Sequence, residues 1–89
     1  MAWTIEFDKR AQRDLAKLDK QVQREIQRYL DYRIAPCDDP KSFGHALVND
    51  LTGVWRYRVR DYRILCRIEA DRLVVLVIEI GHRSTVYDR

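Results

Sequence analysis

The chain has 89 residues, of which 17 are Lys or Arg and 14 are Asp or Glu, giving a formal net charge of +3. This length leaves room for one hydrophobic core, so we expect a single domain over residues 1–89. A hydrophobic content of 46% argues against a disordered chain, and the longest apolar run, residues 73–78, is far shorter than the ~20 residues of a membrane helix.

Two further features favour a cytoplasmic protein. The first residues lack the basic and then apolar segments of a secretion signal. Cys37 and Cys66 do not have metal-ligand spacing, and two cysteines do not make a disulfide framework. Free thiols in a reducing compartment are therefore expected, with no membrane contact.

The first part of the chain predicts one strand and two helices. Apolar and polar residues alternate over residues 3–7, which is typical of a half-buried strand. Apolar residues at helical spacing predict a helix over residues 9–18 and a second, capped by Asp19, that ends near Ala35 because Pro36 follows. The short link between them predicts an antiparallel helical hairpin.

Residues 36–53 predict a long loop. They contain both prolines, two of the three glycines and more acidic than basic residues. His45 lies in this segment, where a solvated side chain explains it as well as a functional one.

The remainder predicts a three-stranded antiparallel meander over residues 54–60, 62–68 and 72–80. Strict alternation in the first strand places its aromatic residues on one face and its arginines on the other. These arginines are Arg56, Arg58 and Arg60. The expected fold is thus α+β, with the helices on one face of the sheet and the arginine-bearing face left as a cleft.

All eight basic residues in residues 54–89 are arginines. Arginine suits planar, two-pronged recognition of phosphate, although arginines also decorate exposed strand faces. The candidate cluster of Arg56, Arg58, Arg63, Arg83 and Tyr87 contains no carboxylate pair and no metal-ligand spacing, and the chain has no glycine-rich phosphate loop, so neither a metal nor a cofactor is expected. The pattern alone favours nucleic-acid binding and supports catalysis only weakly.

Two motifs, Asp61-Tyr62-Arg63 and Gly81-His82-Arg83 followed by Val86-Tyr87, resemble the RelE/ParE toxin superfamily, and more closely its RelE branch. The resemblance covers nearly the whole chain and implies the toxin of a type II toxin–antitoxin pair. It further implies a metal-independent endoribonuclease that cleaves mRNA in the ribosomal A site by attack of the ribose 2′-hydroxyl on the phosphodiester. The implied partners are a cognate antitoxin, the ribosome and mRNA, with operator DNA bound only through the antitoxin complex.

The same resemblance implies roles for individual residues. Arg63 falls where the family has an arginine that stabilises the transition-state phosphate, and Arg83 falls on a second catalytic arginine near the leaving group. Tyr87 falls on a tyrosine that orients or deprotonates the nucleophile.

The sequence departs from the family at Arg56 and Arg58, which stand where well-known members carry lysines. Together with Arg60 they are expected to bind RNA phosphates. Lysine changes its protonation state far more readily than arginine, so a proton-transfer step would pass to Tyr87 or His82.

Two alternatives to the endoribonuclease stay open. One is a non-enzymatic inhibitor of DNA gyrase, as in the ParE branch. The other is a degenerate toxin that only binds its antitoxin and operator DNA. The combination of Arg63, Arg83 and Tyr87 favours the endoribonuclease over the gyrase inhibitor, because a gyrase binder does not need these three residues.

Overall fold

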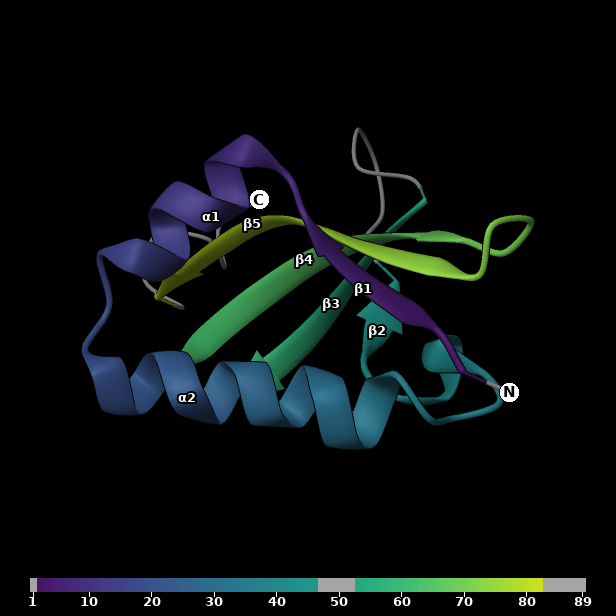
Figure 1. The fold of residues 1–89 in the computed structure, drawn as a ribbon, viewed down its shortest axis with the longest axis horizontal. Helices are drawn as coiled ribbons and strands as arrows, with labels where there is room; N and C mark the ends of the chain where they lie inside the picture. Colours follow the sequence, from purple (N-terminus) through teal and green to yellow (C-terminus); the bar gives the residue numbers. More distant parts are fainter. Residues whose placement is uncertain (1, 47–52, 83–89) are drawn as a thin grey trace.

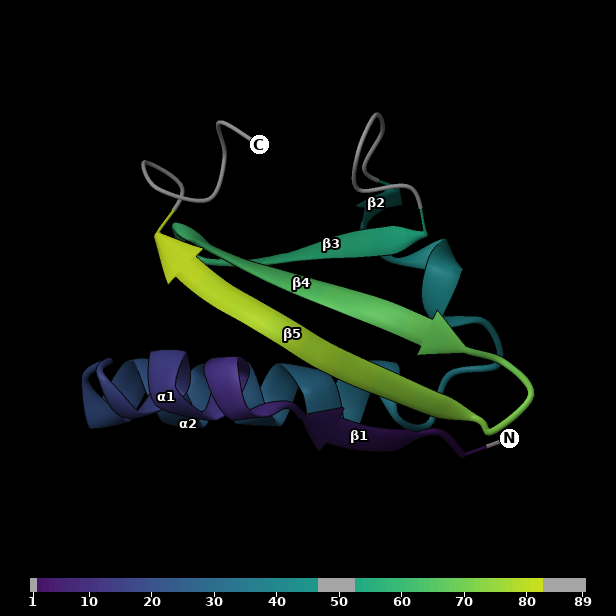
Figure 2. The same ribbon diagram turned by 90° about the horizontal axis from the view of Figure 1, so that it is seen from above.

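The computed structural model describes residues 2–46 and 53–82. Five strands form one sheet in the order β1-β5-β4-β3-β2, and both helices lie on the same side of it (Figures 1 and 2). In chain order the elements are β1 (Thr4–Phe7), α1 (Lys9–Ala16), α2 (Lys20–Tyr29), β2 (His45–Ala46), β3 (Val54–Val59), β4 (Tyr62–Glu69) and β5 (Val74–His82).

The two helices follow the predicted hairpin. Asp8 caps α1 by accepting a hydrogen bond of 2.9 Å from the backbone N–H of Ala11. The helix α2 continues into a π-helical turn over Leu30–Ile34 and stops before Pro36, as expected. In the described residues, no helix is long and apolar enough to cross a membrane.

One core joins the helices to the sheet. The buried side chains of both helices pack with those of β3, β4 and β5 in a single cluster. Its members include Ala11, Ile26, Leu30, Ile34, Tyr57, Ile64, Val75 and Val77. The α+β class and the placement of the helices on one face are therefore confirmed.

The predicted meander is present as β3, β4 and β5, but the sheet is larger than the sequence suggested. The strand β1 pairs in parallel with β5, from Thr4 opposite Val74 to Phe7 opposite Val77. Beyond this pairing, α1 covers the edge of β5, where the carboxylate of Asp14 accepts a hydrogen bond of 3.1 Å from the N–H of Ile80. With neighbours on both sides, β5 is buried enough to explain its apolar sequence.

The prediction that residues 36–53 form only a loop is wrong. They contain a 3₁₀ turn over Pro40–Ser42 and the strand β2, which pairs antiparallel with β3. Two side chains of β3 hold this segment: the hydroxyl of Tyr57 donates to the carbonyl of Pro40 at 2.7 Å, and the indole N–H of Trp55 donates to the carbonyl of Phe43 at 3.1 Å. A two-residue strand is too short to show alternation in the sequence.

The last strand is also shifted from its predicted range of residues 72–80. It begins at Val74 because Leu73 has a positive φ of 52°, which breaks the extended backbone in the turn after β4. It continues through Gly81 and His82, which pair with Arg63 and Tyr62.

The core packing predicts a large effect of Ile26→Ala. Ile26 has no exposed surface and lies between α2 and the sheet, so its truncation should lower the free energy of unfolding by about 3 kcal/mol in chemical denaturation. The exposed Arg24 on the same helix is the matched control. Arg24→Ala should change the free energy of unfolding by less than about 0.5 kcal/mol. Equal effects of the two substitutions would contradict this account of the core.

Candidate functional site: an arginine pocket

The sheet face turned away from the helices carries the arginines of β3 and β4. Tyr57 is fully buried towards the helices, so its neighbours Arg56 and Arg58 lie on the opposite face of β3. Arg63 on β4 is the direct cross-strand partner of Arg58 and therefore shares that face. The alternation that was read from the sequence thus brings three guanidinium groups to adjacent positions.

These arginines line a cavity of about 250 Å³, here called the arginine pocket. Beyond Arg56 no described strand pairs with the outer edge of β3, and there Tyr29 of α2 also lines the pocket, together with the segment before β3. The lining residues are Tyr29, Gly44, His45, Arg56, Arg58 and Arg63. A hollow of this size and charge fits a phosphate group and part of an adjoining sugar.

The electrostatics of this pocket favour an anion. Arg58 and Arg63 face each other directly across the two strands, and like charges in that position destabilise a sheet. Arg63 is only 6% exposed, so water screens its charge poorly. An anion between these side chains would offset their repulsion, which makes the arrangement more useful for binding than for folding.

Gly44 brings the preceding segment into contact with β3. Its φ is +83°, which favours glycine, and a Cβ there would overlap the backbone carbonyl oxygen of Arg56 and lie 2.8 Å from Cδ1 of Tyr57. The next residue, His45, pairs with Arg56 across the strands and so shares the face that bears the arginines. The close approach of the backbone at Gly44 therefore fixes the histidine at the rim of the pocket.

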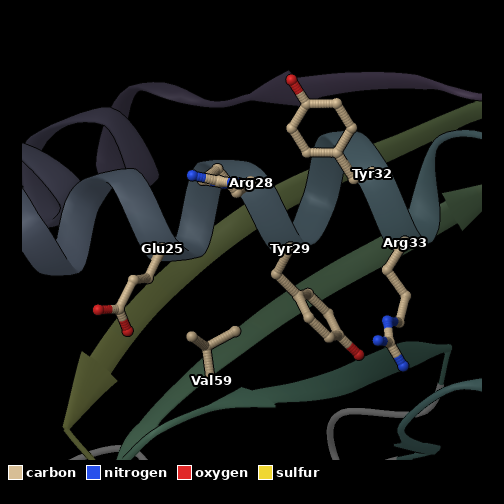
Figure 3. Close-up of a pocket in the computed structure, with 6 residues that line it drawn as sticks. All are labelled: Glu25, Arg28, Tyr29, Tyr32, Arg33 and Val59. Atoms are coloured by element: carbon tan, nitrogen blue, oxygen red, sulfur yellow. The ribbon is translucent and has the colours of Figure 1, made fainter.

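Tyr29 connects the arginine pocket to a second hollow. This groove, of about 540 Å³, lies between α2 and β3, and its lining residues are Glu25, Arg28, Tyr29, Tyr32, Arg33 and Val59 (Figure 3). Figure 3 shows the ring of Tyr29 extending from α2 towards β3. Burial raises the pKa of Tyr29, and the nearby Arg33 guanidinium opposes this shift only in part. The phenol is therefore protonated at neutral pH and can donate a hydrogen bond.

The groove itself is basic and aromatic. Tyr32 is 74% exposed, and the guanidinium of Arg28 lies 5.9 Å from the centre of its ring. An exposed ring beside arginines is a surface on which a nucleic-acid base can stack.

The structure brings together three of the six predicted site residues: Arg56, Arg58 and Arg63 line the arginine pocket. Arg60 lies in the turn after β3, where its guanidinium pairs with the carboxylate of Glu25 at 2.5 and 2.7 Å, and it does not line this pocket. Arg83 and Tyr87 fall outside the described residues.

His82, the histidine of the second sequence motif, lies away from the arginines. Its ring contacts that of Tyr62 edge-on, with the ring centres 5.5 Å apart, on the face that bears the helices. The sequence analysis did not identify Tyr29, Gly44 or His45 as site residues. The glycine directly before His45 is the one local signal that could have drawn attention to that histidine.

Groups suited to metal or thiol chemistry are not part of the pocket. Within residues 2–46 and 53–82, no cluster of three or more His, Cys, Asp or Glu side chains could hold a metal ion. Both cysteines are free, and burial raises the pKa of the Cys66 thiol in the core. That thiol is inert at neutral pH and does not reach the arginine face.

Comparisons with known proteins identify the class to which this fold and site belong. The family described as "ParE toxin of type II toxin-antitoxin system, parDE" matches residues 5–87. The chain therefore belongs to this family of type II toxins, within the RelE/ParE superfamily that its motifs resemble.

Individual relatives include toxins whose names begin with Rel. Toxin RelG of Mycobacterium tuberculosis is 28% identical over 90 residues, covering all of both chains. A chain of the toxin–antitoxin complex RelBE2 from the same organism superposes with a TM-score of 0.85 at 26% identity over 94% of each chain. A variant of E. coli RelE in the free state gives a TM-score of 0.76 at 20% identity, over 98% of this chain and 90% of that one, a likeness that shows the fold alone.

The pocket predicts that Arg58→Gln weakens binding of a nucleic acid without lowering the stability of the fold. Affinity for an uncleavable single-stranded DNA oligonucleotide should fall at least tenfold in fluorescence anisotropy, and the slope of log affinity against log salt should shrink by about one. The free energy of unfolding should stay within about 0.5 kcal/mol or rise, because the substitution removes a like-charge pair.

Arg24→Gln is the control for this measurement, because Arg24 is an exposed arginine on α2 outside the pocket. If Arg24→Gln and Arg58→Gln weaken binding equally, the oligonucleotide responds to net charge rather than to the arginine pocket.

Proposed function

We propose that this protein is a ribosome-dependent endoribonuclease that cleaves mRNA in the A site and so inhibits translation. The observation that carries the proposal is the convergence of Arg56, Arg58 and Arg63 on one phosphate-sized pocket. The resemblance to the RelE branch and the similarity to Toxin RelG and to a chain of the RelBE2 complex support it.

The proposed reaction is attack of a ribose 2′-oxygen on the adjacent phosphorus. The O2′–P bond forms, the P–O5′ bond breaks, and the products are a 2′,3′-cyclic phosphate and a 5′-hydroxyl. Negative charge grows on the non-bridging oxygens in the transition state, where Arg63, already poorly solvated, can stabilise it. Arg56 and Arg58 hold the phosphate, Arg83 acts at the leaving oxygen, and Tyr87 orients the nucleophile.

The neighbouring groove extends this proposal to the rest of the substrate. Tyr29 belongs to both hollows, so RNA in the arginine pocket has a continuous basic path towards Arg28 and the exposed ring of Tyr32. Stacking of a base on such a ring contributes about 1–3 kcal/mol without demanding a particular sequence.

We also propose a protein antitoxin as partner, and action in the cytoplasm, where the ribosome is found. Two solved relatives, from Mycobacterium tuberculosis and E. coli, are toxin–antitoxin complexes, and a third, from Pyrococcus horikoshii, is a RelE–RelB complex. Contact with operator DNA would then pass through the antitoxin. An antitoxin segment that covers the arginine face would need acidic residues to match its charge.

Inhibition of DNA gyrase is a second candidate, because the family that matches residues 5–87 is that of the ParE toxins. In that case the arginine face would serve as a binding surface without chemistry. A supercoiling assay with purified gyrase separates this candidate from the first.

Primer extension on a defined message in a reconstituted translation system tests the proposed function. The intact protein should give discrete cuts at A-site codons, with a 2′,3′-cyclic phosphate at one end and a 5′-hydroxyl at the other. Arg83→Ala should reduce the cleavage rate at least 100-fold, because it removes a cation from the transition state. Arg24→Ala should cleave like the parent protein.

Omission of ribosomes should abolish the cuts. Translation that stays uncut at saturating protein would overturn the proposal. Loss of gyrase supercoiling would then support the second candidate. A protein inert in both assays would support the remaining alternative, a degenerate toxin that only binds its antitoxin and operator DNA.

A further inference from the structure

We propose that His45 is the general base of this reaction, accepting the proton of the attacking 2′-hydroxyl. This inference rests on the proposed function and deepens it. From the sequence, the proton-transfer role was open between Tyr87 and His82, and the inference assigns it to His45.

The position of His45 is fixed by the sheet rather than by its own loop. Its Cα partner on β3 is Arg56, so the imidazole lies on the arginine-bearing face of the sheet. The same residue independently belongs to the wall of the arginine pocket. An exposed side chain at the rim of a cationic pocket can reach a bound substrate without entering the core.

Three contacts hold the short segment that carries this histidine. Tyr57 donates to the carbonyl of Pro40, and Trp55 donates to the carbonyl of Phe43. Gly44 completes the attachment through its backbone contact with β3. Burial raises the pKa of Tyr57, which keeps its hydroxyl protonated as a donor. A backbone segment held in this way fixes where the side chain of His45 starts, which limits the positions that the imidazole must sample for proton transfer.

The other described residues of the pocket cannot take this proton. Arginine has no acceptor and stays protonated in proteins, which removes Arg56, Arg58 and Arg63. Tyr29 keeps its proton because burial raises its pKa. Gly44 has no side chain. Among the described lining residues, His45 alone has a ring nitrogen with a lone pair that can accept a proton.

The step balances without a further reactant. As O2′ attacks phosphorus, its proton passes to the imidazole of His45, and the P–O5′ bond breaks. The departing 5′-oxygen takes a proton from water. The hydroxide left behind recovers the proton from the imidazolium, so the histidine returns to its neutral form.

The test is a single-turnover measurement on programmed ribosomes across pH 5.5–8.5. We expect the rate of the parent protein to rise with pH across this range, because a base must be unprotonated to accept the proton. His45→Gln should lower the rate about 100-fold or more and abolish this rise. The other side chains that line the pocket with His45 are those of the three arginines and Tyr29, and burial raises the pKa of Tyr29.

The matched control is His82→Gln, which removes the other histidine of the chain, the one that contacts Tyr62 outside the pocket. It should stay within about threefold of the parent and keep the pH dependence. His45→Ala should regain activity when imidazole is added, because position 45 is open to solvent. Thermal unfolding of all variants should match the parent, as expected for exposed positions.

A substrate with sulfur in place of the bridging 5′-oxygen distinguishes a base from an acid. A thiolate leaves without a proton, so the defect of His45→Gln should persist on this message if His45 is the base. A defect that disappears would assign His45 to the leaving group and overturn the inference.

Two results would separate this inference from the proposed function. If the parent protein cleaves and His45→Gln cleaves with the same rate and pH profile, His45 is not the base, and the endoribonuclease still stands. If Tyr87→Phe loses the pH dependence and His45→Gln keeps it, Tyr87 is the general base. A parent protein that leaves ribosome-bound mRNA intact would overturn both proposals.

Discussion

The whole arrangement depends on one constraint: both helices pack on the same face of the sheet. Side chains alternate between the two faces along each strand. Because α1 and α2 cover one face, every second side chain of β3 and β4 lies on the opposite, uncovered face. Tyr57 and Ile64 enter the core, and Arg58 and Arg63 are left opposite each other outside it. The hydrophobic effect that forms the core thus also gathers the positive charge.

That charge is costly for a structure without a ligand and useful for one that binds phosphate. Arg58 and Arg63 repel each other across the strands, and Arg63 is nearly buried. A ligand of opposite charge offsets such repulsion, and unfavourable local arrangements of this kind are common at functional sites.

The segment before β3 completes the site from the other side. Trp55 and Tyr57 alternate with Arg56 along the same strand, and their polar atoms hold the segment that carries Gly44 and His45. One strand therefore supplies an arginine of the pocket on one face and an anchor for the pocket wall on the other. Substitutions in the core near Tyr57 should therefore also change the arginine pocket, because Tyr57 holds the segment that forms its wall.

The sequence by itself determined the helices, the meander and the faces of its strands, because these follow from local periodicity and from capping residues such as Asp8. It also indicated Arg56, Arg58 and Arg63 as neighbours, since alternation and a short turn place them together. Only the tertiary structure decided that β1 pairs with β5, that Arg60 pairs with Glu25, and that His45 joins the arginines. These contacts join residues far apart in the chain, or depend on a strand of two residues, and neither leaves a periodic signal in the sequence.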